Sequence, residues 1–138
     1  MPARMRRGGS LGRQSEDRPQ DLVRHFHEAF GLGAPEHISV ADFPGELRVR
    51  LIAEELDEFA DAVRRQDPVA MIDALCDLLY VVYGAGVALG VDLEPFFREV
   101  HRSNMAKAGG DTREDGKQLK PEGWEPPQIA AILEQQKS

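Results

Sequence analysis

Two clusters of carboxylates, on two consecutive stretches that read as helix, are the residues best suited to chemistry in this sequence. The clusters are Glu54, Glu55 and Glu58, followed by Asp73 and Asp77. The aspartates interrupt a run, residues 68–90, that carries no other charge. Ionised carboxylates gathered in an apolar setting repel one another unless a cation or protons compensate them. The pattern therefore predicts a site for a divalent cation that prefers oxygen ligands.

The first cluster does not lie on the ordinary exposed face of its helix. At about 100° per residue, the three glutamates share one arc with Leu47 and Leu51. The opposite side carries the mixed charges of an exposed face: Arg50, Asp57, Asp61 and Arg64. We therefore expect the three glutamates to point toward neighbouring protein.

The second cluster stands on one face of the following helix, because Asp73 and Asp77 are four residues apart. Only Asp67-Pro68 separates the two helices, so they should form an antiparallel hairpin in which the acidic faces meet. Oxygen ligands without Cys or paired His favour Mg²⁺ or Mn²⁺ over Zn²⁺.

A structural interpretation of the same acids stands beside the metal site. Paired glutamates on helices are common and usually solvated. Cations such as Arg48 or Lys107 would neutralise the cluster in a purely structural network. The two aspartates favour the metal site, since solvation alone explains poorly why charged groups interrupt an apolar run.

The elements that position these residues read as helices joined by loops, without strand-type alternation. Pro19 opens a first helix that ends near Phe30, and Asp42 with Pro44 starts the second. Asp67 and Asp92 cap the third and fourth. The other expected segments are a loop at 31–44, a loop at 109–127 and a short terminal helix containing Ile129, Ile132 and Leu133.

Length and composition limit the class of protein. The 138 residues fit one domain at 19–138, preceded by a flexible arm at 1–18 that lacks the apolar stretch of a signal peptide. A net charge of -7 disfavours nucleic acid as a partner. The single cysteine, Cys76, excludes an internal disulfide, fits a buried core thiol and suits a cytoplasmic location.

Residues 69–89 are long enough to raise the question of a membrane span. Two aspartates near its middle would each cost about 2.5–3.5 kcal/mol on insertion. We therefore expect no membrane association and a buried helix in a soluble bundle. Because this helix is apolar almost all round, a homodimer or larger homo-oligomer is expected to cover it.

The strings EELDEF at 54–59 and DALCDLLYVVYGAGVALG at 73–90 resemble the MazG-like all-α nucleoside triphosphate pyrophosphohydrolases. This superfamily includes dimeric dUTPases and phosphoribosyl-ATP pyrophosphohydrolases, and its pattern is EExxE followed by ExxD. HRSNMAK at 101–107 and REDGKQLKPEG at 113–123 look like later segments of one subgroup. The sequence departs from the pattern at Ala74, where the family has Glu, and Asp73 is the expected replacement.

The resemblance implies a four-helix bundle of the MazG-like type with a short additional C-terminal helix. It implies Mg²⁺ or Mn²⁺ held by Glu55, Glu58, Asp73 and Asp77, with Glu54 or Glu55 activating water. The residues expected to face substrate are His27, Phe30, Arg102, Asn104, Lys107, Lys117 and Lys120. Each has an ordinary alternative role in packing or at the surface, and Trp124 is expected to anchor its loop.

The implied reaction is hydrolysis of a nucleoside triphosphate to a monophosphate and pyrophosphate. We expect dUTP or another noncanonical nucleotide as substrate, in cleansing of the nucleotide pool. One alternative is phosphoribosyl-ATP hydrolysis, which shares the metal chemistry but needs room for a larger ligand. A second is a nonenzymatic helical interaction module whose acids form salt bridges.

Overall fold

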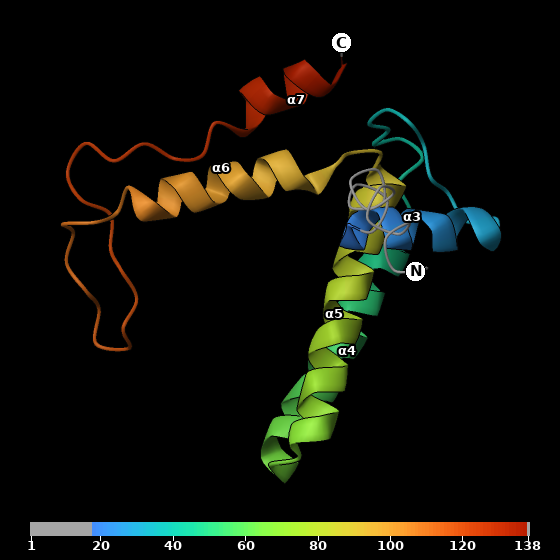
Figure 1. The fold of residues 1–138 in the computed structure, drawn as a ribbon, viewed down its shortest axis with the longest axis horizontal. Helices are drawn as coiled ribbons and strands as arrows, with labels where there is room; N and C mark the ends of the chain where they lie inside the picture. Colours follow the sequence, from blue (N-terminus) through green and yellow to red (C-terminus); the bar gives the residue numbers. More distant parts are fainter. Residues whose placement is uncertain (1–17, 138) are drawn as a thin grey trace, which may run out of the picture. The chain divides into compact units, whose positions relative to one another are not determined.

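Helices account for the regular structure of the protein, described here by a computed structural model over residues 18–137. Most of the predicted arm, residues 1–17, lies outside the described residues. In the described part there are five helices: α3 (Pro19–Ala29), α4 (Gly45–Arg65), α5 (Pro68–Leu89), α6 (Leu93–Met105) and α7 (Ile129–Lys137) (Figure 1). The predicted all-α fold with a short C-terminal helix is confirmed.

Aspartate and glycine set the ends of the two central helices. The Asp67 carboxylate accepts a hydrogen bond from the Ala70 N–H at 3.1 Å, which caps α5. Helix α5 ends at Gly90, whose φ of 91° is a left-handed conformation. Asp92 caps α6 in the same way by accepting from the Glu94 N–H at 3.1 Å. These predicted boundaries are confirmed.

The start of α4 differs in detail from the prediction. Pro44 occupies the N-cap, and no side chain caps this end of the helix. Asp42 lies two residues upstream, where its carboxylate accepts a hydrogen bond from the Ser39 hydroxyl at 3.1 Å. The prediction that the helix starts at Asp42 is therefore wrong, because the residue belongs to the preceding loop, whereas Pro44 stands at the start of the helix as predicted.

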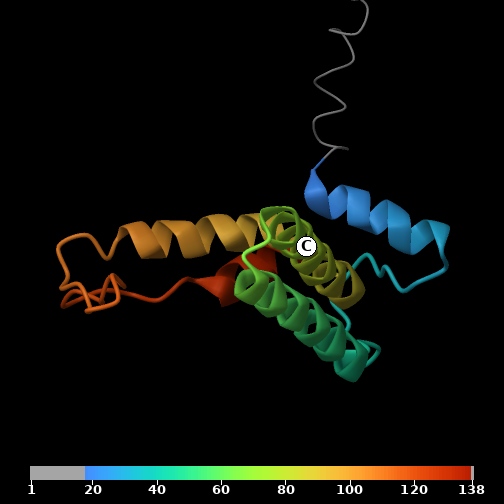
Figure 2. The same cartoon turned by 90° about the horizontal axis from the view of Figure 1, so that it is seen from below.

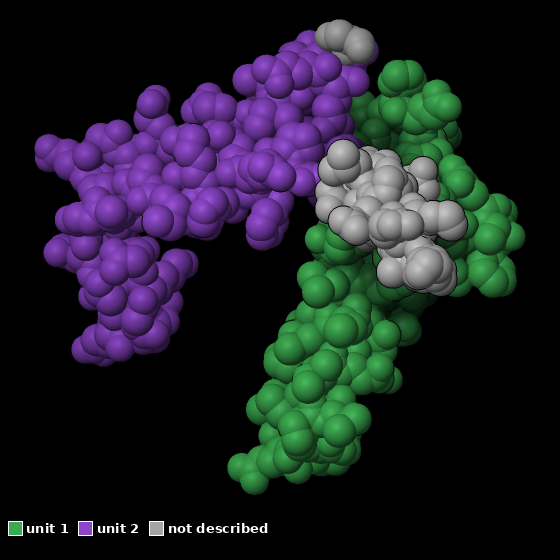
Figure 3. Space-filling view, in the orientation of Figure 1, with its two compact units in different colours: residues 1–91 green, residues 92–138 purple. Residues whose placement is uncertain are grey.

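The described residues divide into two compact units, 18–91 and 92–137, coloured separately in Figure 3. In the first unit α4 and α5 lie side by side as the predicted antiparallel hairpin, and α3 packs on α5 (Figures 1 and 2). Ala62 and Ala74, 1% and 4% exposed, let the two helices approach closely near the turn of the hairpin. The hairpin is the element that brings the two acidic faces together.

The loop at 31–44 is fastened to the C-terminal end of α5. The Ser39 N–H donates to the Leu89 carbonyl at 3.0 Å. A Cβ at Gly90 would collide with the His37 carbonyl oxygen, so the close approach of this loop requires glycine there. Arg24 of α3 donates to the carbonyls of Ala34 and Pro35, which holds the loop from the other side.

The second unit contains α6, α7 and the connection between them. The Gln136 side chain accepts from the Asp92 N–H at 3.2 Å and donates to the Asp92 carbonyl at 2.9 Å. Trp124 donates from Nε1 to the Ser103 carbonyl at 2.7 Å. The prediction that Trp124 anchors its loop is confirmed. Within the same loop, Thr112 and Gln118 form an isolated antiparallel bridge.

Helix α5 is long and apolar enough to cross a membrane by length and composition alone, a test that core helices of soluble proteins also pass. Cys76, predicted to lie in the core, is exposed on α5. That prediction is wrong because α5 is apolar almost all round, while among the described elements only α3 and α4 pack extensively against it.

Candidate metal centre

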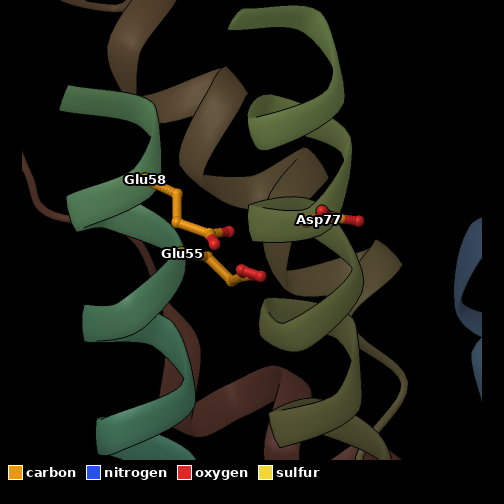
Figure 4. Close-up of side chains that lie close together, drawn as sticks. All are labelled: Glu55, Glu58 and Asp77. Atoms are coloured by element: carbon orange, nitrogen blue, oxygen red, sulfur yellow. The ribbon is translucent and has the colours of Figure 1, made fainter. Parts of the chain in front are cut away.

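Three carboxylates from α4 and α5 converge on one point of the hairpin. Glu55, Glu58 and Asp77 each offer an oxygen atom, and these atoms all lie within 4.8 Å of one another. Figure 4 shows Glu55 and Glu58 extending from α4 toward α5, which carries Asp77. The acidic faces predicted from the sequence therefore do meet.

Helical spacing and hairpin geometry explain the convergence. Glu55 and Glu58 are three residues apart, so they project from the same side of α4. Asp77 faces them because the antiparallel hairpin sets the middle of α5 against the middle of α4. Glu55 and Asp77 are half-buried, whereas Glu58 is exposed, so the cluster opens to solvent at one side.

The environment of Glu55 disfavours its ionised form. Partial burial raises the pKa of Glu55, and the negative charges of Glu58 and Asp77 raise it further. A hydrogen bond with Glu58 and the charge of Glu54 act in the same direction. Among the described residues, no Lys or Arg forms an ion pair with Glu55, Glu58 or Asp77. The cluster therefore carries repulsion that a bound cation would relieve.

The donor set fits a hard divalent cation. Three carboxylates with no His or Cys match the oxygen ligands preferred by Mg²⁺ and Mn²⁺. Both ions complete their coordination with water or substrate oxygens, so an open side suits them. Arg48 and Lys107, the cations considered for a structural network, form no ion pair among the described residues.

Two other acids of the predicted site lie outside this group of three. Asp73 is exposed and lines a surface depression of about 420 Å³ together with Glu58 and Arg65. Glu54 is exposed beside the group and acts on it through its charge. Asp73 as a ligand and Glu54 as a base remain predictions.

Two of the residues predicted to face substrate, His27 on α3 and Phe30 just after it, differ in environment. His27 is only 2% exposed, and its Nδ1 lies 2.9 Å from the Gly33 carbonyl oxygen. A carbonyl oxygen can only accept, so Nδ1 carries the proton in this hydrogen bond. Phe30 is 67% exposed and lies against Phe26, with ring centroids 4.5 Å apart. The structure thus buries His27 and leaves Phe30 open to solvent.

The other substrate-side candidates all belong to the second unit: Arg102, Asn104, Lys107, Lys117 and Lys120. Arg102 forms a two-bond ion pair with Glu99, at 2.8 and 2.9 Å. This pair and the Gln128 N–H lower the pKa of Glu99 to about 2.

The remaining residues of that group surround Trp124 or face solvent. The ammonium groups of Lys107 and Lys120 lie 5.4 and 5.0 Å from the centre of the Trp124 ring. Asn104 and Lys117 are exposed. Their predicted contacts with substrate remain predictions.

Arg48 was predicted only as a cation that would neutralise the acids, and the structure places it on α4 with 8% exposure. The available signal was its position seven residues before Glu55, two helical turns away on the same face. A charged residue on the inward face of a helix indicates a buried charge, whose cost must be compensated.

Comparison with known proteins agrees with the acidic motif. The family model described as phosphoribosyl-ATP pyrophosphohydrolase matches residues 23–104, more than half of the chain. An uncharacterized protein of Acanthamoeba polyphaga mimivirus is 45% identical over 49 residues, which are 36% of this chain and 20% of that protein. The chain therefore spans only a small part of this relative. The match of residues 23–104 to the family model establishes that this chain belongs to the phosphoribosyl-ATP pyrophosphohydrolase family, within the MazG-like all-α superfamily that the acidic motif resembles.

Proposed function

We propose that the protein hydrolyses a nucleoside triphosphate to the monophosphate and pyrophosphate in the presence of Mg²⁺ or Mn²⁺. The convergence of Glu55, Glu58 and Asp77, which form no ion pair with a Lys or Arg of the described residues, is the observation that carries this proposal. Family membership supports the same reaction class. Asp73 is a further candidate ligand at the edge of the site.

The chemistry asks for charge compensation and positioning more than for covalent catalysis. When bound, a divalent cation would neutralise the polyphosphate and hold its oxygens in place. Glu54 is exposed beside the three acids, where it is free to accept a proton from the attacking water. The water oxygen bonds to the α-phosphorus, the bond from that phosphorus to the bridging oxygen breaks, and pyrophosphate leaves.

Glu55 is the other candidate base. Its raised pKa suits a proton acceptor that works near neutral pH, but its position among the three acids suits a ligand equally well. We assign ligation to Glu55 and proton transfer to Glu54. His27, Phe30 and the basic residues of the second unit complete the proposed contacts with substrate.

The proposed substrate is dUTP or another noncanonical deoxynucleotide, which would place the protein in cleansing of the cytoplasmic nucleotide pool as a homodimer or larger homo-oligomer. A second candidate is phosphoribosyl-ATP, which the description of the matching family model favours. The two reactions share the metal chemistry and differ in the nucleotide that must be accommodated.

A panel of nucleoside triphosphates and phosphoribosyl-ATP, each with Mg²⁺ or Mn²⁺, tests the proposal. Release of pyrophosphate together with a monophosphate supports the reaction class, and the ranking of kcat/KM identifies the substrate. Release of orthophosphate, or turnover that EDTA leaves unchanged, would contradict the proposed reaction. A nonenzymatic interaction module would turn over none of these compounds.

A further inference from the structure

Arg48 is a largely buried arginine whose Nε has no hydrogen-bond partner among the described residues. The residue is 8% exposed, and no ion pair among the described residues involves it. Burial lowers the pKa of Arg48. A buried charge without compensation is costly, so such a group indicates a place where an external acceptor binds.

A cavity of about 500 Å³ adjoins this guanidinium. Arg48, Pro44 and Ala88 line it together with Asp42 and the loop residues 33–35. Arginine presents five N–H donors and no acceptor, whereas the Asp42 carboxylate offers acceptors. No ion pair joins Arg48 to Asp42 in the described structure, so a ligand can use both groups. Glycine, alanine and proline make up most of the remaining lining.

The cavity and the candidate metal centre lie along the same face of the α4–α5 hairpin. On α4, Arg48 precedes Glu55 by seven residues, which is two turns or about 10 Å along the helix. On α5, Gly84 follows Asp77 by seven residues and lies opposite Arg48. The separation of the cavity from the candidate metal centre is therefore similar to the separation of the base from the phosphates within one nucleotide.

Gly84 provides the room that the guanidinium occupies. A Cβ at this position would stand 2.8 Å from Nη1 of Arg48 and 3.4 Å from Nε2 of His27. The first distance is too short for two non-bonded atoms, so an alanine would displace the guanidinium. His27, held by its hydrogen bond to Gly33, limits where the guanidinium can move.

We propose that the cavity receives the base of the substrate, with Arg48 donating to a ring carbonyl and Asp42 accepting from the adjacent ring N–H. This inference rests on the first candidate of the proposed function, and it disfavours phosphoribosyl-ATP, whose base is adenine. It specifies the substrate class as nucleotides of oxo-bases such as uracil, thymine, guanine and hypoxanthine. Adenine and cytosine present an amino donor and a bare ring nitrogen along this edge. Their donor would face the guanidinium and their lone pair the carboxylate, which leaves both protein groups unpaired.

Binding of deoxynucleoside monophosphates without metal tests this inference separately from catalysis. Calorimetric titrations with dUMP, dGMP, dCMP and dAMP use the wild-type protein and the Arg48→Met variant. We expect wild type to bind the two oxo-base nucleotides about tenfold or more tightly than the other two, as one charge-assisted hydrogen bond would give. In Arg48→Met this preference should fall to within about twofold.

Three further variants exclude a merely structural role for Arg48. Arg50→Met removes an exposed arginine of the same helix and should keep the wild-type preference. Arg48→Lys keeps the charge without the planar fork, and Gly84→Ala keeps the arginine but displaces it. Both should reduce the preference, and melting curves by circular dichroism confirm that each variant is folded. If Arg48→Met does not fold, these two variants give the answer.

Equal binding of all four monophosphates by wild type would overturn the inference. Equal weakening of all four in Arg48→Met would also overturn it, because that result places Arg48 on the phosphate. A folded Arg48→Lys or Gly84→Ala with an unchanged preference would contradict it as well. A wild-type preference that depends on Arg48 supports the base site even if no triphosphate is hydrolysed, in which case only the proposed function fails.

Discussion

Glu55 shows most directly how the fold acts on a single functional group. Its position on the inner side of α4 gives partial burial, and its neighbours Glu58 and Asp77 add like charge. These effects raise the pKa of Glu55, and the positive charge of a bound cation would lower it again. The same repulsion lowers the stability of the folded protein, which favours a functional explanation for the presence of these acids.

Removing one ligand should stop the reaction without unfolding the protein. In Glu58→Gln or Asp77→Asn we expect pyrophosphate release to fall by about 100-fold or more, since loss of a direct ligand should exceed the effect of losing an outer-shell partner. The melting temperature without metal should stay equal or rise, because one repulsive charge is gone. Asp57→Asn, an exposed acid outside the group of three, is the matched control and should retain activity. Unchanged turnover in both variants would exclude these residues from the mechanism.

The raised pKa of Glu55 also predicts how stability depends on pH in the absence of metal. The folded state holds the Glu55 proton more tightly than the unfolded state, whose pKa is near the ordinary 4.5. Stability should therefore decrease as pH rises from about 4.5 through the higher folded pKa. Urea unfolding of wild type and Glu55→Gln across this range measures the effect. The variant should lack this part of the decrease, and parallel curves would contradict the prediction.

Not every residue could be placed from the sequence. The acids were identifiable because helical periodicity and one hairpin fix which side chains meet. Cys76 was misplaced because burial depends on which neighbours cover each side of α5, and periodicity cannot reveal that for a helix that is apolar all round. Arg48 gave a weaker signal, since a single basic residue among apolar ones also fits a solvated position.

Among the elements, the loop at 31–44 is the one whose attachment to α5 most affects the proposed base site beside Arg48. Its residues line the cavity beside Arg48 and bind the end of α5 through Ser39. Most helix limits were predictable because proline and aspartate begin helices and glycine ends them through local geometry, but the start of α4 was predicted too early. The course of the loop was not, because it is set by contacts between residues about fifty positions apart, such as Ser39 and Leu89.

Gly90 should be the most sensitive glycine of this region. In Gly90→Ala the left-handed backbone alone costs about 1–2 kcal/mol, and the added Cβ also collides with the His37 carbonyl. Gly31→Ala is the matched control, because Gly31 has a φ of 69° and open space around its Cβ position. Urea unfolding should show a clearly larger loss of stability for Gly90→Ala. Equal losses would mean that the loop does not approach the end of α5 as described.

For the molecule as a whole, the main feature without an explanation is the exposed apolar face of α5. Val69, Ile72 and Leu79 are 77%, 63% and 56% exposed, and they share this face with Cys76. A contiguous apolar stripe of this kind is typical of an interaction surface. We predict that a second copy of the chain covers it, as expected from the composition of the helix.

The association state and the reactivity of Cys76 test this prediction together. Wild type should sediment as a dimer or larger oligomer, and its Cys76 should react slowly with a thiol reagent. Leu79→Glu should sediment as a monomer whose Cys76 reacts quickly, since a buried charge would oppose association. Val40→Glu, which adds the same charge at a residue 73% exposed in the loop, should behave like wild type. A monomeric wild type with a rapidly reacting thiol would contradict the prediction.

Binding of Mn²⁺, followed by electron paramagnetic resonance of the free ion, tests the proposed metal centre most directly. Wild type and Asp57→Asn should bind Mn²⁺ alike, whereas Glu58→Gln and Asp77→Asn should bind it at least about tenfold more weakly, because each loses a carboxylate of the group of three. Equal Mn²⁺ affinity in all four proteins, or no binding by wild type, would contradict a metal centre formed by Glu55, Glu58 and Asp77.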